Sequence, residues 1–241
     1  MKKIICMLII AAHLSACATY ESRAVSFRPP QGYSNYQDVS GLLVGAEAFS
    51  DKQRAEDIFG FDIRGAGIFP VQIVIDNKAG QAVEIISGQT FIVDSSNNYW
   101  KILPNREAAE RVQKATETGA IGSGAGKGAA FGAAAGALLG LALGVVSGRN
   151  IAESVVKGGV LGGAGGAVIG GASKAGDDRP REFKIADDVR EKGIEGKIFP
   201  VESLASGFIY FPGEVTTATE LRLQVRFRET GKIQTLNLKF Y

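Results

Sequence analysis

Nucleophilic and metal-binding side chains are concentrated at one end of the chain. Both cysteines, Cys6 and Cys17, and the only histidine, His13, fall within the first seventeen of 241 residues. Thiolates and imidazoles supply many of the nucleophiles, general bases and zinc ligands of enzymes. If these residues belong to a leader, the remaining chain has no histidine and no free thiol. Cysteine nucleophiles, imidazole bases and ordinary zinc sites are then excluded.

Two further groups have the spacing of catalytic pairs. Ser154 and Lys157 match the serine–lysine step of penicillin-recognising enzymes, but the companion motifs are missing. We interpret them as part of a polar turn. Asp187 and Asp188 are neighbours on a predicted helix and cannot face each other, so we interpret them as a solvated face. We therefore expect no catalytic residue, no bound metal and no cofactor, and we expect that the protein is not an enzyme.

Two groups could instead bind a ligand. Tyr99 and Trp100 form either an aromatic binding pair or the packed rim of a β-domain, and rim packing is more common. Arg222, Arg226 and Arg228 alternate along a predicted strand. They would form either a patch for anions and lipid headgroups or a plain exposed sheet face. The formal net charge is only +2, so no basic excess points to nucleic acid.

The N-terminus reads as an export signal. Two lysines precede the apolar stretch 4–12, and Leu-Ser-Ala-Cys at positions 14–17 supplies a small-residue cleavage site. The stretch is too short to be a transmembrane helix. We predict a signal peptide at residues 1–16, with cleavage between Ala16 and Cys17.

These last four residues resemble the lipobox of bacterial lipoproteins. The resemblance implies that Cys17 is lipidated, with palmitate-type acyl chains that would anchor the protein at about 0.8 kcal/mol per buried methylene. It also implies the outer membrane, with the folded body facing the periplasm, because Ala18 rather than aspartate follows the cysteine. Residues 17–38 are polar and lack periodicity, so we expect a lipidated N-terminus and linker.

A glycine-rich stretch at 119–175 is the most unusual part of the sequence. Each glycine inside a helix costs about 0.5–1 kcal/mol relative to alanine, so a helix with this composition needs a compensating contact. Glycines four residues apart create a smooth groove into which another helix packs closely. We therefore expect helix packing through Gly124, Gly128, Gly132, Gly136, Gly140, Gly144, Gly148, Gly158, Gly162, Gly166 and Gly170.

The same stretch contains two uncharged arms. Residues 128–148 would extend about 31 Å as a helix, and residues 158–173 about 24 Å. The hydrocarbon layer is about 30 Å thick, so the first arm just spans it and the second is short. We expect a transmembrane helical hairpin that returns the chain to its starting side. A hairpin folded over the rest of the protein remains an alternative.

Alternating apolar residues predict short strands on both sides of this stretch. Neither group is large enough to bury a good core alone. We therefore expect an α+β fold, in which one β-sandwich has halves at 39–103 and 194–241 and a helical insert at 104–193. The expected strands are 41–49, 71–75, 83–86, 90–93, 99–102, 197–200, 206–211, 221–227 and 236–240. Their order in the second half loosely resembles immunoglobulin-like domains of bacterial periplasmic lipoproteins.

Cap and turn residues delimit three short helices outside the glycine stretch. Asp51 and Asn105 are predicted N-caps, and Gly193 is predicted to end the last helix. The expected helices are 51–58, 106–118 and 182–192.

The lipobox, the two glycine arms and the flanking β-segments together resemble the glycine-zipper two-transmembrane lipoproteins of bacterial outer membranes. The resemblance implies a structural or assembly protein that supports envelope integrity or a membrane complex. Its implied partners are membrane lipids, further copies of the chain in a homo-oligomer, and an envelope protein. An oligomeric pore or secretion component and a periplasmic binding module remain alternatives.

Overall fold

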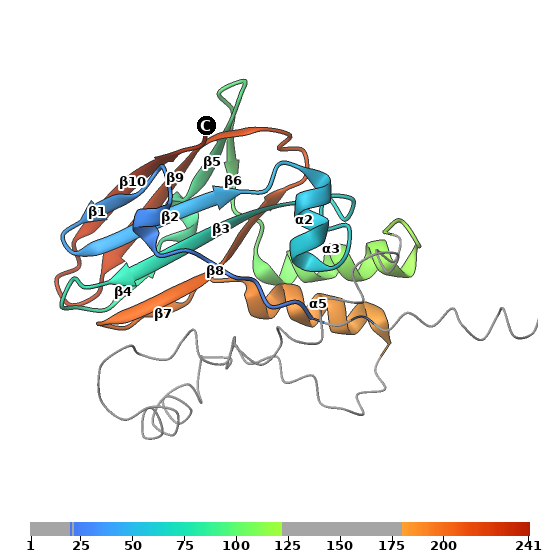
Figure 1. Cartoon of the computed structure of the whole chain (residues 1–241), viewed down its shortest axis with the longest axis horizontal. Helices are drawn as coiled ribbons and strands as arrows, with labels where there is room; N and C mark the ends of the chain where they lie inside the picture. The colour runs from blue at the N-terminus through green and yellow to red at the C-terminus, as the bar shows by residue number, and fades with distance from the viewer. Residues whose placement is uncertain (1–19, 21, 122–179) are drawn as a thin grey trace, which may run out of the picture.

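The computed structural model describes Tyr20, residues 22–121 and residues 180–241 (Figure 1). The expected cleavage site at Ala16 and Cys17 lies outside these ranges. So do Ser154, Lys157 and all the glycines of the predicted zipper.

The described chain is a mixed α+β fold built mainly from two antiparallel sheets. The first sheet has the order β1-β2-β3-β8, with β1 at Gln37–Val39, β2 at Leu42–Ala48, β3 at Ile68–Asn77 and β8 at Ser203–Pro212. The second has the order β6-β5-β9-β4-β7, with β10 also paired to β9. Its strands are β4 (Val83–Ile85), β5 (Phe91–Asp94), β6 (Tyr99–Lys101), β7 (Ile198–Phe199), β9 (Ala218–Phe227) and β10 (Ile233–Lys239).

Both sheets combine strands from the two sides of residues 122–179. In the first sheet β3 pairs with β8 over ten positions, from Ile68 opposite Pro212 to Asn77 opposite Ser203. In the second, β9 pairs with β4 and β5. Neither sheet is complete without strands from both sides of this range.

The main core lies between the two sheets. Leu221, Leu223 and Val225 of β9 occupy alternate positions and are fully buried against Val71 and Ile73 of β3. Alternation directs successive side chains to opposite faces of a strand, so each sheet keeps one face for this core. Burying a side chain of this size contributes about 1.5–3 kcal/mol.

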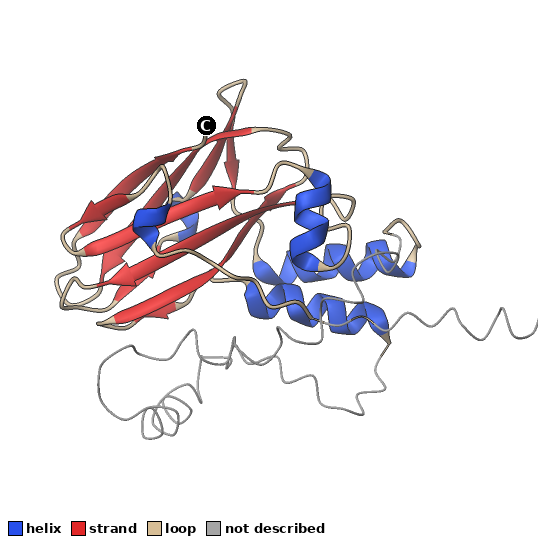
Figure 2. Ribbon diagram, in the orientation of Figure 1, coloured by secondary structure: helices blue, strands red, loops and turns tan. Residues whose placement is uncertain are grey.

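Three α-helices pack at one end of the first sheet (Figure 2). They are α2 (Lys52–Phe59), α3 (Asn105–Glu117) and α5 (Arg181–Lys192); η1 (Pro30–Gly32) and η2 (Ser87–Gln89) are short 3-10 turns. Phe59 of α2, Val112 of α3 and Val189 of α5 form a second core with Phe208 and Tyr210 of β8. The described part of the chain therefore has a second core outside the one between the sheets, and we call the three helices around it the helical layer.

Helices α3 and α5 form a pair that we call the helical stalk. They pack against each other, and the end of α3 lies beside the start of α5 (Figure 1). Just before α3, the Leu103 amide donates to the Tyr210 carbonyl at 2.8 Å. Just after α5, the Ile194 amide donates to the Phe208 carbonyl at 2.9 Å. The start of α3 and the end of α5, which we call the feet of the stalk, are thus attached to the same edge of β8.

The predicted cap of α2 is confirmed, whereas that of α3 is wrong. Asp51 Oδ1 accepts from the Arg54 amide at 2.7 Å. Asn105 is instead the first residue of its helix, after Pro104 in an extended conformation. The Asn105 amide donates to Glu195 Oε2 at 2.8 Å, so a carboxylate distant in sequence caps this end.

The segment expected to be a linker packs on the domain from Tyr20 onward. Tyr20 and Val25 are buried in the second core. Tyr33 lies over β2, and the Asn35 side chain bonds to both the amide and the carbonyl of Ala46, at 3.1 and 2.9 Å. We call Tyr20 and residues 22–36 the strap.

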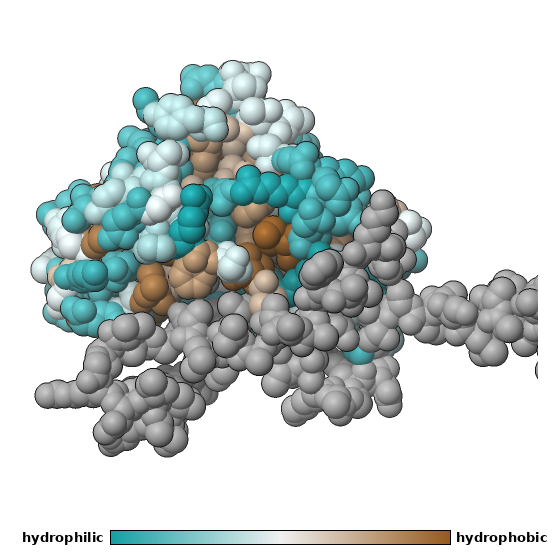
Figure 3. Space-filling model, in the orientation of Figure 1, coloured by the Kyte–Doolittle hydropathy of each residue, from teal (hydrophilic) through white to brown (hydrophobic). Residues whose placement is uncertain are grey.

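On the face shown in Figure 3, polar residues separate several small apolar areas.

Gly45 allows the strap to lie close to β2. A Cβ atom at this position would be 2.7 Å from Tyr33 Cδ2 and 2.8 Å from the Pro30 carbonyl oxygen. We expect Gly45→Ala to lower the free energy of unfolding by about 1–3 kcal/mol, as other overpacked sites do. Urea unfolding followed by circular dichroism measures it. Gly88→Ala, with no atom within 4 Å of the added carbon, is the control, and equal stability of the two variants would contradict the strap contact.

Candidate functional site

A buried polar cluster joins the strap to α5. Tyr20 Oη donates to Asp188 Oδ2 at 2.5 Å, and Ser22 Oγ donates to Asp188 Oδ1. Lys192 Nζ forms an ion pair with Asp188 and lies 3.2 Å from Ser22 Oγ. We call these four residues the clamp. The Asp188 carboxylate is its centre, because all three other side chains bond to it.

The clamp follows from the helical spacing of α5. Asp188 and Lys192 are four residues apart and therefore lie on one face of the helix. Ile185 and Val189 on the adjoining face are fully buried. The Lys192 and Asp188 side chains are only 10% and 7% exposed. A buried pair of this kind pays a large desolvation cost, so it depends on complete bonding by its neighbours.

Tyr20 supplies both an apolar ring and a donor to this cluster. Its ring meets Phe61 edge-on at 6.1 Å between centroids. Its hydroxyl also lies 3.2 Å from the Phe59 carbonyl oxygen. Burial, followed by the charge of Asp188, raises the Tyr20 pKa well above its ordinary value of 10.0. The phenol therefore keeps its proton and serves as a hydrogen-bond donor.

Tyr210 connects the same part of α5 to the first sheet. Its hydroxyl donates to the Val189 carbonyl at 2.9 Å, and its side chain is fully buried. Burial, together with the charge of Asp188, raises the pKa of Tyr210 as well. The strap and the stalk are thus both held against β8 of the first sheet.

The described residues adjoin positions 17–19 and 122–179 at the helical layer. Tyr20 leads back toward Cys17 and belongs to the second core. Ile121, the last described residue before 122–179, is buried in that core too. Pro180, the first described residue after that range, is the N-cap of α5. All three exits lie on the helical layer rather than on the second sheet.

The expectation for the two neighbouring aspartates is half wrong. Asp187 lies on the outer face and pairs with Arg190 at 2.8 Å. Asp188 is buried in the clamp because the helix turns about 100° per residue, which takes it from the exposed face to the buried one. The i,i+4 spacing of Asp188 and Lys192 beside apolar residues could have indicated a buried ion pair. No pattern in the sequence indicates that Tyr20 and Ser22 join it, since the strap has no periodicity.

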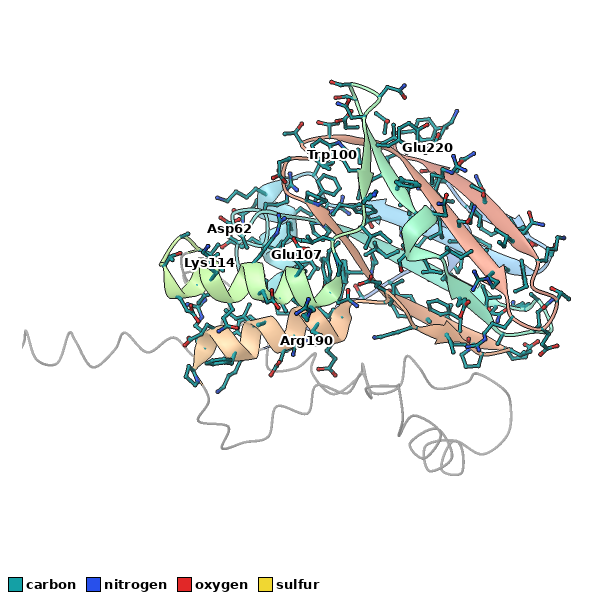
Figure 4. The ribbon with its side chains drawn as sticks, turned by 180° about the vertical axis from the view of Figure 1, so that it is seen from behind. Asp62, Trp100, Glu107, Lys114, Arg190 and Glu220 are labelled. Carbon is teal, nitrogen blue, oxygen red and sulfur yellow. The ribbon has the colours of Figure 1, made fainter. Side chains whose placement is uncertain are left out.

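Tyr99 and Trp100, the aromatic binding candidates, make packing and hydrogen-bond contacts within the fold. Trp100 Nε1 donates to Asp94 Oδ2 at 2.9 Å, and its ring packs on the rim of the main core. Tyr99 is 58% exposed and makes an edge contact with Phe91. Figure 4 shows Trp100 far from Lys114, which lies in the last turn of α3. The aromatic pair is therefore remote from the end of the stalk where α3 ends and α5 begins.

The arginine row is partly neutralised by one carboxylate. Arg226 and Arg228 lie 2.8 and 3.7 Å from the two oxygens of Glu84. The Arg222 Nε atom is buried without a hydrogen-bond partner. This arrangement favours an exposed sheet face with ordinary surface pairs over a concentrated anion site.

Asp94 has a strongly perturbed acidity. Hydrogen bonds from Trp100 and then from Asn98 lower its pKa from an ordinary 3.8 to about 2. A depressed folded-state pKa stabilises the protein above the unfolded value, and this contribution is lost as pH falls through the folded value. We expect Trp100→Phe to lower the melting temperature at pH above 3.8, with a difference that shrinks toward pH 2. Circular dichroism measures it, and Tyr99→Phe is the control; a pH-independent difference would contradict the carboxylate's role.

The remaining observations concern metals, membrane spans and relatives. Within Tyr20, 22–121 and 180–241, no group of three or more metal-ligating side chains occurs. Among the described helices, none combines the length and apolar character needed to cross a bilayer. Comparison of the chain with protein-family models, curated proteins and solved structures finds no match.

Proposed function

We propose that this chain is a lipid-anchored structural or assembly protein of the bacterial outer membrane. In this proposal Cys17 carries the acyl chains and the body faces the periplasm. The observation that carries the proposal is the position of the three exits. The anchor segment and both ends of the glycine-rich segment leave the helical layer, so a single membrane surface can receive all three.

The proposal assigns the glycine-rich segment to the membrane. Residues 119–175 form a helical hairpin whose glycine faces pack on each other and on further copies of the chain. The two sheets form an immunoglobulin-like sandwich into which this hairpin is inserted. The role is mechanical rather than enzymatic: it supports envelope integrity or a membrane complex through lipids, homo-oligomer contacts and an envelope protein partner.

Acylation at Cys17 is tested by expressing the full chain and its Cys17→Ser variant in a Gram-negative host. We expect labelled palmitate in the wild-type protein only, and mass spectrometry should place the mature N-terminus at Cys17. Ala18→Ser is a matched control that keeps the cysteine. An unlabelled wild-type protein would contradict the anchor.

Glycine-face packing is tested separately by crosslinking in membranes. Cysteines replace Gly132 and Gly166, and a cysteine at Ala134 is the control because it lies about 200° around the helix from Gly132. We expect disulfide products between arms or between copies from the glycine positions and fewer from Ala134. Absence of any product from Gly132 and Gly166 would contradict the packing model.

A further inference from the structure

We infer that the exit end of the helical stalk is the surface that rests on the lipid bilayer. This end comprises the last turn of α3 and the first turn of α5, next to Ile121 and Pro180. The inference rests on the proposed function, since it takes Cys17 to be acylated. It adds the orientation of the folded body, which anchoring alone does not determine.

The first argument is the shortness of the free tether. A flexible chain of the length of residues 17–38 would span about 25 Å on average and would leave the body free to turn. The clamp instead fixes Tyr20 through Asp188. Only two residues lie between Cys17 and Tyr20, so their Cα atoms are at most about 11 Å apart. Asp188 is seven residues, about 10 Å along α5, from Arg181 at the exit end. An acylated Cys17 therefore holds α5 close to the membrane and can itself reach the level of the exit end.

The second argument is the direction of the stalk. Its feet are attached to β8 by Leu103 and Ile194. Helix α3 has 13 residues, which at 1.5 Å per residue makes the stalk about 20 Å long. The chain then enters and leaves the glycine-rich segment at the far end of this stalk. A body resting on its second sheet would direct these exits away from the bilayer.

The third argument is the chemistry of the exit end. Phe183, in the first turn of α5, is 44% exposed, and aromatic rings are enriched where protein meets the headgroup region. Arg181 and Lys184 lie in the same turn and are partly buried, and the Arg181 Nε atom is fully buried. Glu182 and Glu117 balance their charge, so zwitterionic lipid is a sufficient partner.

Brominated lipids test this orientation because bromine quenches nearby tryptophan fluorescence. The full lipidated chain is purified from membranes and reconstituted into phosphatidylcholine vesicles with brominated acyl chains. Two reporters are made in a Trp100→Phe background, Phe183→Trp and Ile233→Trp. Ile233, at the start of β10 on the second sheet, is 49% exposed and so matches Phe183 in solvent access. Circular dichroism verifies that both variants are folded.

We expect the Phe183→Trp protein to lose fluorescence in brominated vesicles and the Ile233→Trp protein to keep it. Native Trp100 should also remain unquenched. Equal quenching of the two reporters, or quenching of Ile233→Trp alone, would overturn the orientation while leaving the anchor intact. Flotation of the vesicles is the separate readout for anchoring. A wild-type protein that does not float with them would overturn the proposed function and this inference with it.

Discussion

Replacing Asp188 with alanine is expected to lower the free energy of unfolding by about 3–5 kcal/mol, the usual effect of removing one partner from a buried ion pair. The substitution leaves the Lys192 ammonium buried without its counter-charge. It also deprives Tyr20 and Ser22 of their common acceptor. The loss should therefore include release of the strap as well as damage to α5.

Urea unfolding of the detergent-solubilised chain, followed by Trp100 fluorescence, measures this effect. The control is Asp187→Ala, one residue away, where an exposed pair with Arg190 contributes at most about 1 kcal/mol. A double variant, Asp188→Leu with Lys192→Met, should lose less than the single one, since no buried charge is left unpaired. Equal losses for Asp187→Ala and Asp188→Ala would refute the clamp.

Phe59→Ala is expected to cost about 3–5 kcal/mol, the range for truncating a buried phenylalanine. Phe59 is fully buried at the end of α2. Its ring lies 4.7 Å from that of Phe208 on β8 and 6.0 Å from that of Phe61, between centroids. Truncation would leave a cavity where α2, the strap and the first sheet meet.

The matched control for this variant is Phe183→Ala, which removes the same ring from a helix position that is 44% exposed. Its effect should be much smaller, because little packing is lost at an exposed site. Thermal unfolding by circular dichroism separates the two variants. If Phe59→Ala melts within a few degrees of Phe183→Ala, the second core does not stabilise the fold as argued.

Nine of the ten strands in the described residues were predictable, because the two faces of a half-buried strand produce alternating apolar and polar residues in the sequence. β1 (Gln37–Val39) was missed, since it begins within the segment expected to be a linker. Leu221, Leu223 and Val225 alternate with Arg222 and Gln224 in the sequence, and the first three are buried. The helices α2, α3 and α5 were also found to within one or two residues at each end, the usual uncertainty of helix boundaries. Local patterns were sufficient for these elements.

The clamp and the cap of α3 were not predictable from local patterns. Tyr20 lies 168 residues from its partner Asp188, and Glu195 reaches Asn105 across 90 residues. Both contacts arise only after β8 has brought the feet of the stalk together. A polar N-terminal segment without periodicity reads as a linker unless such distant partners are known.

The pairing of β3 with β8 also constrains how the protein can fold. Gln72 bonds to Ser206, 134 residues later. The chain must therefore lose the conformational entropy of closing a long loop before the β3–β8 hydrogen bonds can form. Topologies with such distant pairings fold slowly, and their intermediates expose unpaired strand edges. During synthesis, β2 and β3 remain without their C-terminal partner strands until the glycine-rich segment has already been made. A nascent chain that ends before Ser203 should therefore need a holding chaperone and be prone to aggregation and proteolysis.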